Sequence, residues 1–120
     1  MCFVMILLAL AAGGCSRYSP RDGDIVFQAP RSNQNEVVQL ATHAVYSRMG
    51  MLYVQEGKPF VFEVAGTVTL TPLKRWIRKG KDEQYVVKRL KESDRLLTTN
   101  GLEKIKGTAR QHLGKPYDAF

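Results

Sequence analysis

Cysteine is nearly absent from this chain, and what there is lies at one end. Two of the 120 residues are cysteines, Cys2 and Cys15. No disulfide can therefore cross-link the body of the protein, and residues 16–120 offer no thiol for nucleophilic catalysis or metal binding. Histidine is also scarce, at two residues, so the sequence predicts no zinc site, and we expect no cofactor. A chain of this length buries a single hydrophobic core.

Long apolar runs are missing as well. The continuously apolar stretch 4–10 is too short to cross a bilayer, which takes about 20 residues. Residues 1–14 carry no charged side chain, a composition typical of the apolar part of an export signal. We therefore expect residues 1–15 to be a leader and residues 16–20 to be a linker to the body.

The end of this leader, Ala12-Gly13-Gly14-Cys15, resembles a bacterial lipobox, in which small residues precede a cysteine that becomes lipidated. The resemblance implies a lipid anchor at Cys15 that attaches the protein to a membrane. It also implies a place at the periplasmic face of the bacterial cell envelope, in the outer membrane because Ser16 is not an inner-membrane retention signal. The alternatives are an ordinary cleaved signal and a start codon that lies elsewhere.

Charge is distributed unevenly along the chain. The net charge is +7, and the basic excess falls in residues 72–115, which contain thirteen basic and five acidic residues. Such a surface suits anionic lipid headgroups or an anionic polymer. The alternative is an ordinary solvated surface, because the basic residues alternate with acidic and apolar ones. No aromatic-rich nucleic-acid motif accompanies the charge, so we expect no nucleic-acid partner.

The residue patterns predict an α+β fold with an antiparallel sheet, a central hairpin and helices packed on the sheet. Glu56-Gly57-Lys58 is the expected hairpin turn. Thr71 is expected to cap a helix with Pro72 at its first position, and Asn100 with Glu103 resembles a capping box. The expected strands are 24–28, 49–55, 59–65, 67–70 and 85–90, and the expected helices begin near Ser32, Pro72 and Asn100 and end near His43, Gly80 and Leu113.

Four sequence blocks occur in an order that resembles a known family. They are Arg21-Asp22-Gly23-Asp24-Ile25-Val26-Phe27-Gln28, Thr42-His43-Ala44-Val45-Tyr46-Ser47-Arg48-Met49-Gly50, Val61-Phe62-Glu63 and Leu113-Gly114-Lys115-Pro116-Tyr117-Asp118. The family is that of the circularly permuted papain-like amidases and peptidases, a branch of the NlpC-type cell-wall hydrolase superfamily. The resemblance runs from residue 21 to residue 120, which we take as one partial domain.

The resemblance implies a role for several positions. In the family, the histidine of a Ser-His-x-Gly segment is the catalytic base, and this position holds Arg48 here. Glu63 matches the residue that orients the base. Tyr117 matches a Gly-x-Pro-Tyr segment that leads into the helix bearing the cysteine nucleophile. Because the sequence stops at Phe120 before such a cysteine, we expect a truncated, inactive domain with apolar surface exposed near the hairpin.

Strand periodicity predicts that Arg48 and Glu63 are partners. A turn over Glu56-Gly57 or Gly57-Lys58 places Gly50 or Leu52 opposite Glu63, and in both registers Arg48 shares the face of Glu63. A carboxylate in an otherwise apolar strand needs a partner if it is buried. The alternative is that Glu63 lies on an edge strand and faces water.

The remaining candidates are weaker. His43 is five residues from Arg48 and is interpreted as a junction residue, with a catalytic role as the alternative. His112 is interpreted as a partly buried structural histidine of the last helix. Asp22-Gly23-Asp24 has too few ligands for a metal loop and is interpreted as a turn that begins the first strand.

Three functions remain open from the sequence. The first is an amidase or peptidase lineage, acting on a peptide, acyl or amide bond of the envelope and inactive in this chain. The second is an envelope-tethered pseudoenzyme in which Arg48 holds a carboxylate-bearing peptide or acyl ligand. The third is a decayed gene product without function. The substrate and the oligomeric state are left open.

Overall fold

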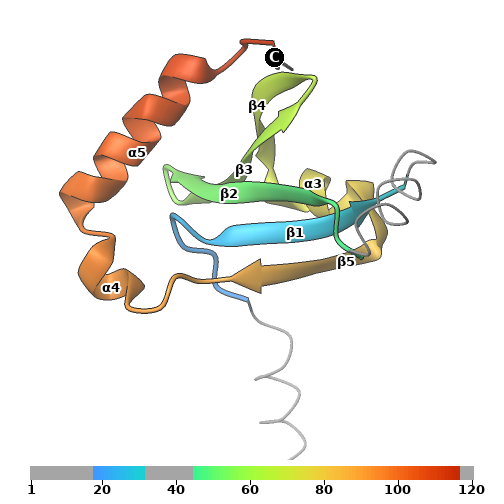
Figure 1. The fold of residues 1–120 in the computed structure, drawn as a ribbon, viewed down its shortest axis with the longest axis horizontal. Helices are drawn as coiled ribbons and strands as arrows, with labels where there is room; N and C mark the ends of the chain where they lie inside the picture. Colours follow the sequence, from blue (N-terminus) through green and yellow to red (C-terminus); the bar gives the residue numbers. More distant parts are fainter. Residues whose placement is uncertain (1–17, 32–44, 117–120) are drawn as a thin grey trace, which may run out of the picture.

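The computed structural model describes residues 18–31 and 45–116, and these residues form one antiparallel sheet with helices on both sides (Figure 1). The strand order is β4-β3-β2-β1-β5. The expected helix from Ser32 to about His43 lies outside the described residues. The elements are β1 Ile25–Pro30, β2 Arg48–Gln55, β3 Lys58–Ala65, β4 Thr67–Pro72, α3 Leu73–Lys79, β5 Gly80–Lys88, α4 Ser93–Leu96 and α5 Thr99–His112. None of the described helices is long and apolar enough to cross a membrane.

The central hairpin is confirmed. β2 and β3 pair with Gln55 opposite Lys58 and Met51 opposite Phe62. The two turn residues, Glu56 and Gly57, both have positive φ angles, of 52° and 75°. Such a turn matches the right-handed twist of its strands, and glycine adopts this backbone without strain. The register therefore follows the first of the two expected turns.

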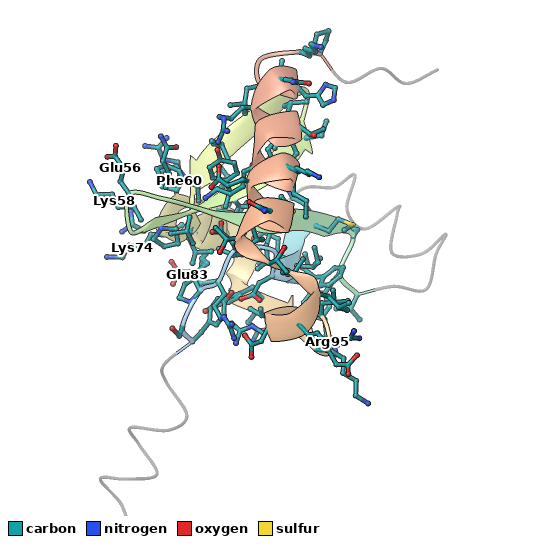
Figure 2. The ribbon with its side chains drawn as sticks, turned by 90° about the vertical axis from the view of Figure 1, so that its left-hand side faces the viewer. Glu56, Lys58, Phe60, Lys74, Glu83 and Arg95 are labelled. Carbon is teal, nitrogen blue, oxygen red and sulfur yellow. The ribbon has the colours of Figure 1, made fainter. Side chains whose placement is uncertain are left out.

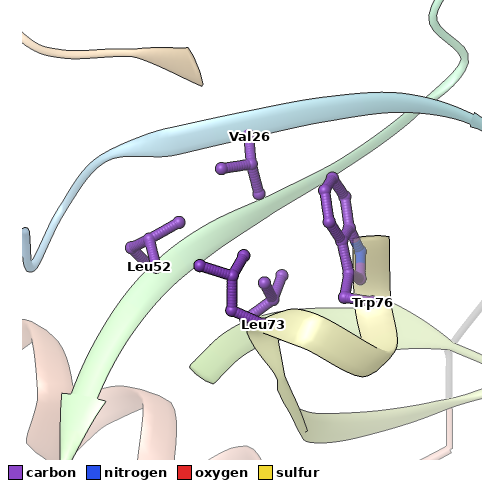
Figure 3. Close-up of a cluster of buried hydrophobic side chains, with 5 residues drawn as sticks. Val26, Leu52, Leu73 and Trp76 are labelled. Atoms are coloured by element: carbon purple, nitrogen blue, oxygen red, sulfur yellow. The ribbon is translucent and has the colours of Figure 1, made fainter. Parts of the chain in front are cut away.

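The core lies between the sheet and α3. Val26, Leu52 and Val61 project from three adjacent strands onto Leu73 and Trp76 of α3, and all five side chains are buried (Figure 3). The three strand residues lie on one face of the sheet, and Leu73 and Trp76, three residues apart, lie on one face of α3. The expected apolar stripe of this helix is confirmed, with Ile77 packed at the border of the cluster.

Two helix starts differ from the prediction. Pro72 is the N-cap residue of α3, no side chain caps this helix, and the Thr71 hydroxyl donates to Glu63 instead. Thr71 belongs to β4 and precedes the N-cap position, and its hydroxyl lies within reach of the buried carboxylate. The N-cap of the last helix is Thr98, whose side-chain oxygen accepts a hydrogen bond from the Gly101 backbone N–H at 3.1 Å, so the expected capping box at Asn100 is wrong.

The fifth strand also differs from its prediction. It spans Gly80–Lys88 instead of residues 85–90. Its first half is polar, and most of that half is exposed, so apolar alternation could not reveal it. Gly80 ends α3 with an extended backbone (φ −78°, ψ 151°) and begins β5 directly. A β-carbon at Gly80 would lie 2.4 Å from Oε1 of the buried Gln28, so a larger residue there would require the Gln28 side chain to move.

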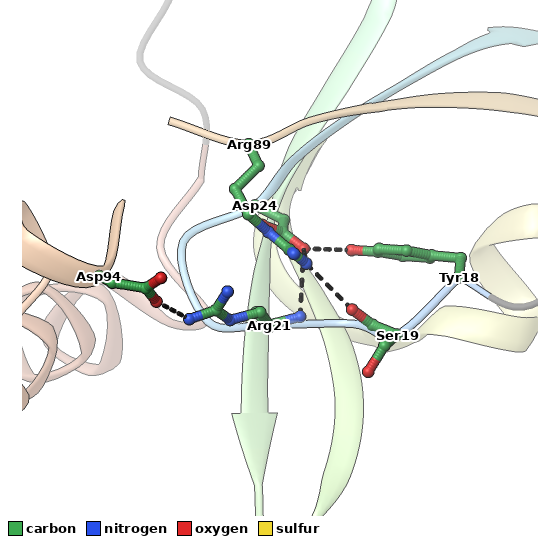
Figure 4. A network of polar contacts seen from close by, with 6 residues as sticks. All are labelled: Tyr18, Ser19, Arg21, Asp24, Arg89 and Asp94. Carbon is green, nitrogen blue, oxygen red and sulfur yellow. Dashed lines mark hydrogen bonds and ion pairs between the residues drawn. The ribbon is translucent and has the colours of Figure 1, made fainter. Parts of the chain in front are cut away.

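A buried polar network joins the start of the domain to Arg89, the residue that follows β5 (Figure 4). Asp24 is 1% exposed and accepts hydrogen bonds from Tyr18 Oη (2.5 Å), the Arg21 backbone N–H (3.1 Å) and two nitrogens of Arg89 (2.8 Å each). Burial alone raises the pKa of Asp24, but these donors, Arg89 foremost, outweigh it and hold the pKa below its usual value. Burial and the bond to Asp24 raise the pKa of Tyr18. The expected turn at Asp22-Gly23-Asp24 thus has a structural role.

Helix α5 stands beside the sheet and crosses β2 instead of running along it (Figure 2). Nζ of Lys106 contacts the Val54 carbonyl at 2.5 Å and lies 4.6 Å from the centre of the Tyr53 ring. Arg110 donates to the Tyr53 hydroxyl at 2.7 Å. Beyond the C-terminal end of α5, the Gly114 N–H donates to the Val68 carbonyl of β4. The helix is therefore held near the tip of the hairpin and at β4.

Candidate functional site

The site expected at the start of β2 is built around an ion pair. Nη2 of Arg48 lies 3.0 Å from Oε2 of Glu63, and the two side chains are 23% and 1% exposed. The pairing of Met51 with Phe62 continues to Gly50 opposite Glu63, so Arg48 lies two residues along on the same face. The prediction that the two side chains share a face and touch is confirmed.

Glu63 is not an edge residue that faces water. Its strand β3 lies between β2 and β4, and Glu63 pairs with Thr69 of β4. Besides Arg48, its carboxylate accepts hydrogen bonds from the Thr71 hydroxyl at 3.0 Å and from the indole N–H of Trp76 at 2.9 Å. Three donors thus surround this carboxylate, which offsets the cost of burying it. The expectation that Glu63 is buried and partnered is confirmed.

Gln28 is the residue that faces Arg48 from the neighbouring strand. It pairs with Arg48 in the β1–β2 register and is fully buried. Neither polar atom of its side-chain amide has a hydrogen-bond partner among the residues that the structure describes. A buried amide of this kind costs free energy.

Next to the ion pair lies an apolar groove of about 960 Å³ between the sheet and α5. Its floor is the sheet face opposite the core. The helix contributes Lys104, Ile105, Thr108, Ala109 and His112, and Ser47, Arg48, Gly50 and Glu63 also border the groove. The side chains of Arg48 and Glu63 point to the opposite, core face, where Glu63 meets Trp76. The apolar floor consists of Ile25, Met49, Met51, Phe62 and Val64. The expected exposure of apolar surface near the hairpin is confirmed by Met49, which is 58% exposed, and Val64, which is 46% exposed.

The other candidate residues named from the sequence either lie away from the ion pair or fall outside the described residues. His112 lines the groove from the last turn of α5 and is exposed, so its interpretation as a partly buried histidine is wrong. His43, Tyr117 and Cys15 lie outside the described residues, so the structure does not test their expected roles. In the two stretches that the structure describes, no three or more His, Cys, Asp or Glu side chains form a group that could hold a metal ion.

Sequence reasoning missed the side chains that hold Glu63. Trp76 was assigned to the core and Thr71 to a helix cap, yet both donate to the Glu63 carboxylate. One signal was present: Trp76 is the only tryptophan, and its N–H needs an acceptor when the ring is buried. Trp76 and Glu63 are 13 residues apart in the sequence, so neither a helical nor a strand period predicts their contact.

The chemistry available at this pair follows from its charges. A guanidinium stays protonated at physiological pH, so it donates hydrogen bonds and cannot accept a proton. Glu63 accepts from Arg48, Thr71 and Trp76. The pair can hold a second anion at the exposed edge of Arg48, and Arg48 cannot serve as a general base.

Comparison with known proteins identifies the family of the chain. A family model described as permuted papain-like amidase enzyme, YaeF/YiiX, C92 family, matches residues 19–120. The uncharacterized protein YiiX of Escherichia coli K12 is 44% identical over 115 residues, which cover 96% of this chain and 55% of YiiX. The chain therefore spans about half the length of this curated relative.

A solved structure shares the fold. It is titled the crystal structure of metalloprotein yiiX from Escherichia coli O157:H7, and it matches with a TM-score of 0.77 at 46% identity. The match covers 84% of this chain and 54% of that one. The word metalloprotein describes that protein, and no metal-binding cluster is found among residues 18–31 and 45–116 of this chain. With a family match that spans residues 19–120, the chain belongs to the permuted papain-like amidase family C92.

Proposed function

We propose that this chain is a non-hydrolytic member of its amidase family, within the NlpC-type branch of cell-wall hydrolases. The observation that carries the proposal is the contact of 3.0 Å between Arg48 and Glu63 at the position where the family resemblance expects a histidine base. Papain-like hydrolysis needs a thiolate, an imidazole that takes the proton and a polar group that orients the imidazole. This chain retains the orienting group, Glu63, and has a cation, Arg48, at the position of the imidazole.

The ion pair removes the base in two ways. Arg48 cannot take a proton from a thiol. It also occupies Oε2 of Glu63, while Thr71 occupies Oε1. The imidazole of His112 lines the groove on the other face of the sheet, so it does not reach the Glu63 carboxylate. Residues 16–120 contain no cysteine.

In this proposal the retained function is binding. Arg48 is 23% exposed, so the part of its guanidinium that does not contact Glu63 can bind a carboxylate. The ligand class is a peptide or acyl compound of the cell envelope that carries a carboxylate. The export signal and lipid anchor at Cys15 are part of the same proposal and would keep the protein at the periplasmic face of the envelope.

The experiment has a catalytic arm and a binding arm. The full chain and its Arg48→His variant are incubated with peptidoglycan stem peptides and with acyl-ester probes, and neither should exceed the blank. Reproducible turnover that survives repurification would overturn the proposal that the chain is non-hydrolytic.

In the binding arm, a stem peptide with a free C-terminal carboxylate should bind at least tenfold more tightly than its amide. Arg48→Gln should abolish this preference, and equal affinity of the two peptides for the parent chain overturns the carboxylate role.

A further inference from the structure

The outer face of α3 carries only basic side chains. Its buried residues, Leu73 and Trp76, face the sheet. At about 100° per residue, the exposed positions of this helix cover an arc of about 140° on the opposite side. These positions are Lys74, Arg75, Arg78 and Lys79. Figure 2 shows Lys74 extending outward from the ribbon. Together with Lys81, which is exposed at the start of β5, the four residues form what we call the α3 basic face.

The cations of the α3 basic face have no acidic partners. None of the five side chains forms an ion pair or a hydrogen bond with residues 18–31 or 45–116. Other basic side chains in these two stretches do pair with a carboxylate, namely Arg21, Arg48, Arg89, Arg95 and Lys106. Asp82 and Glu83 follow on β5, yet residues 74–83 still contain five basic and two acidic residues. Unneutralised positive charge therefore gathers on this side of the molecule.

Helix stability does not explain this arrangement. A helix has a partial positive charge at its N-terminus and a partial negative charge at its C-terminus. Arg78 and Lys79 in the last turn suit that dipole. Lys74 and Arg75 lie in the first turn, where cations are unfavourable, and no acidic residue in that turn compensates them. Four like charges kept together at such a cost are typical of a surface that binds an anionic partner.

We propose that the α3 basic face docks on a bilayer surface that contains anionic phospholipid. Each Lys or Arg close to such a surface strengthens binding about fivefold. The start of the described chain lies on the same side of the sheet. Tyr18 packs against the core cluster, which α3 covers, and its ring centre is 6.4 Å from that of Tyr85.

The lipid anchor proposed at Cys15 would therefore attach on the side of α3. Cys15 precedes Tyr18 by three residues, which span at most about 11 Å. An anchor and a basic face on one side of the molecule can contact one bilayer together, and two such signals bind a membrane more firmly than one. The preference for a membrane over a soluble anionic polymer rests on that anchor, which belongs to the proposed function, whereas the positive charge of α3 is independent of it.

Vesicle co-sedimentation tests the docking surface. The full chain is made by cell-free synthesis, so that Cys15 carries no lipid, and is mixed with two kinds of vesicle. One contains phosphatidylglycerol and phosphatidylcholine in equal amounts, and the other contains phosphatidylcholine alone. Residues 1–14 carry no charge, so their apolar contribution is common to both vesicles. We expect at least tenfold tighter binding to the anionic vesicles.

Salt should remove this preference. Raising the NaCl concentration from about 0.1 M to about 1 M shortens the Debye length from about 10 Å to about 3 Å, so the two kinds of vesicle should then bind the chain alike. Equal binding to both vesicles already at the lower salt concentration overturns the inference.

A triple variant locates the surface on α3. Lys74→Gln, Arg75→Gln and Arg78→Gln together should reduce the preference for anionic vesicles at least tenfold. Glutamine is a good helix former, and the three side chains are exposed, so the variant should fold. Circular dichroism checks this.

The matched control removes the same number of charges elsewhere. It combines Lys88→Gln, Lys91→Gln and Lys115→Gln, all at exposed positions. Lys88 and Lys91 line a pocket with Ile105 on the α5 side of the sheet, and Lys115 follows α5. The control should keep the preference within about threefold of the parent, since only its net charge changes. Equal loss of preference in the two folded triple variants overturns the inference.

A soluble polymer as the partner gives a different result. Binding of poly-glutamate that is lost in the α3 variant, without binding to anionic vesicles, would assign the face to an anionic polymer and overturn the inference. The failure of the anchor is a separate outcome, because the vesicle assay uses unlipidated protein. Absence of fatty-acid labelling at Cys15 would overturn that part of the proposed function, and a preference for anionic vesicles that depends on α3 would still support the docking surface.

Discussion

The guanidinium of Arg48 and the carboxylate of Glu63 meet across the central hairpin at 3.0 Å. The contact joins the first residue of β2 to a buried position of β3, and the two-residue turn at Glu56-Gly57 sets the register that allows it. Glu63 is 1% exposed in this pair and Arg48 is 23% exposed. The carboxylate is therefore the desolvated partner, and its stability depends on the cation and the two neutral donors around it.

Replacing Arg48 by alanine should destabilise the fold by about 1–3 kcal/mol, because Glu63 would keep its buried charge and lose its cation. Urea unfolding of the two proteins, followed by circular dichroism, measures this difference. Arg78, exposed on α3, is the matched control, and Arg78→Ala should change stability by less than about 0.5 kcal/mol.

A double-mutant cycle isolates the pair itself. Arg48→Ala should cost less when Glu63 is already glutamine, since no buried charge then remains to be compensated. Strict additivity of the two substitutions would mean that Arg48 contributes only surface packing.

Trp76→Phe should destabilise the protein by about 2–4 kcal/mol, through a packing loss and through the missing N–H donor to Glu63. The donor contribution can be separated because Glu63→Gln weakens the acceptor. In that background the Trp76→Phe penalty should shrink by about 1 kcal/mol. Circular dichroism is the suitable probe, since Trp76 is the only tryptophan. An unchanged penalty would show that the indole acts by volume alone.

Cys15→Ser should abolish lipid labelling. In a bacterial host fed a labelled fatty acid, the parent chain should become labelled and migrate with the outer-membrane fraction, because the lipobox resemblance places the modified thiol at Cys15. Cys2→Ser, in the same leader, is the control and should be labelled like the parent. Equal labelling of the Cys15→Ser protein would contradict lipoprotein processing and leave ordinary secretion possible.

The sequence predicted what depends on local periodicity and missed what depends on distant partners. The hairpin and the shared face of Arg48 and Glu63 follow from a period of two and a recognisable turn. The polar half of β5 has no such pattern, and its pairing with β1 is a long-range property. Trp76 and Thr71 donate to Glu63 because β4 and α3 fold back over β3, which no local pattern near Glu63 reveals.

The exposed face of the groove was predicted from the family resemblance and not from local periodicity. The exposed apolar face at Met49 and Val64 was expected because the family resemblance implies a further helix against the sheet. The attachment of α5 through Lys106 and Arg110 was not expected, since long side chains that reach backbone carbonyls and tyrosine hydroxyls leave no periodic trace in the sequence.

Asp24→Asn should destabilise the fold at neutral pH by about 2–3 kcal/mol, since the amide keeps the shape of the carboxylate but loses its charge and faces Arg89 with a donor. Arg89 is 38% exposed and regains some hydration, which keeps the loss below that of a fully buried pair. Asp94, whose side chain is 80% exposed in its pair with Arg21, is the control. Asp94→Asn should change stability by less than about 0.5 kcal/mol.

The pH dependence follows from the direction of the Asp24 pKa shift. Folding lowers the pKa of Asp24, so the unfolded chain binds the proton more readily than the folded one. The stabilisation is complete above the unfolded-state pKa, about 3.9, and is lost as the pH falls through the lower folded-state pKa. The stability difference between the parent and Asp24→Asn, measured by urea unfolding, should therefore be constant from pH 7 to about pH 5 and shrink below about pH 4. A difference that stays constant down to pH 2 would show that the Asp24 charge does not stabilise the network.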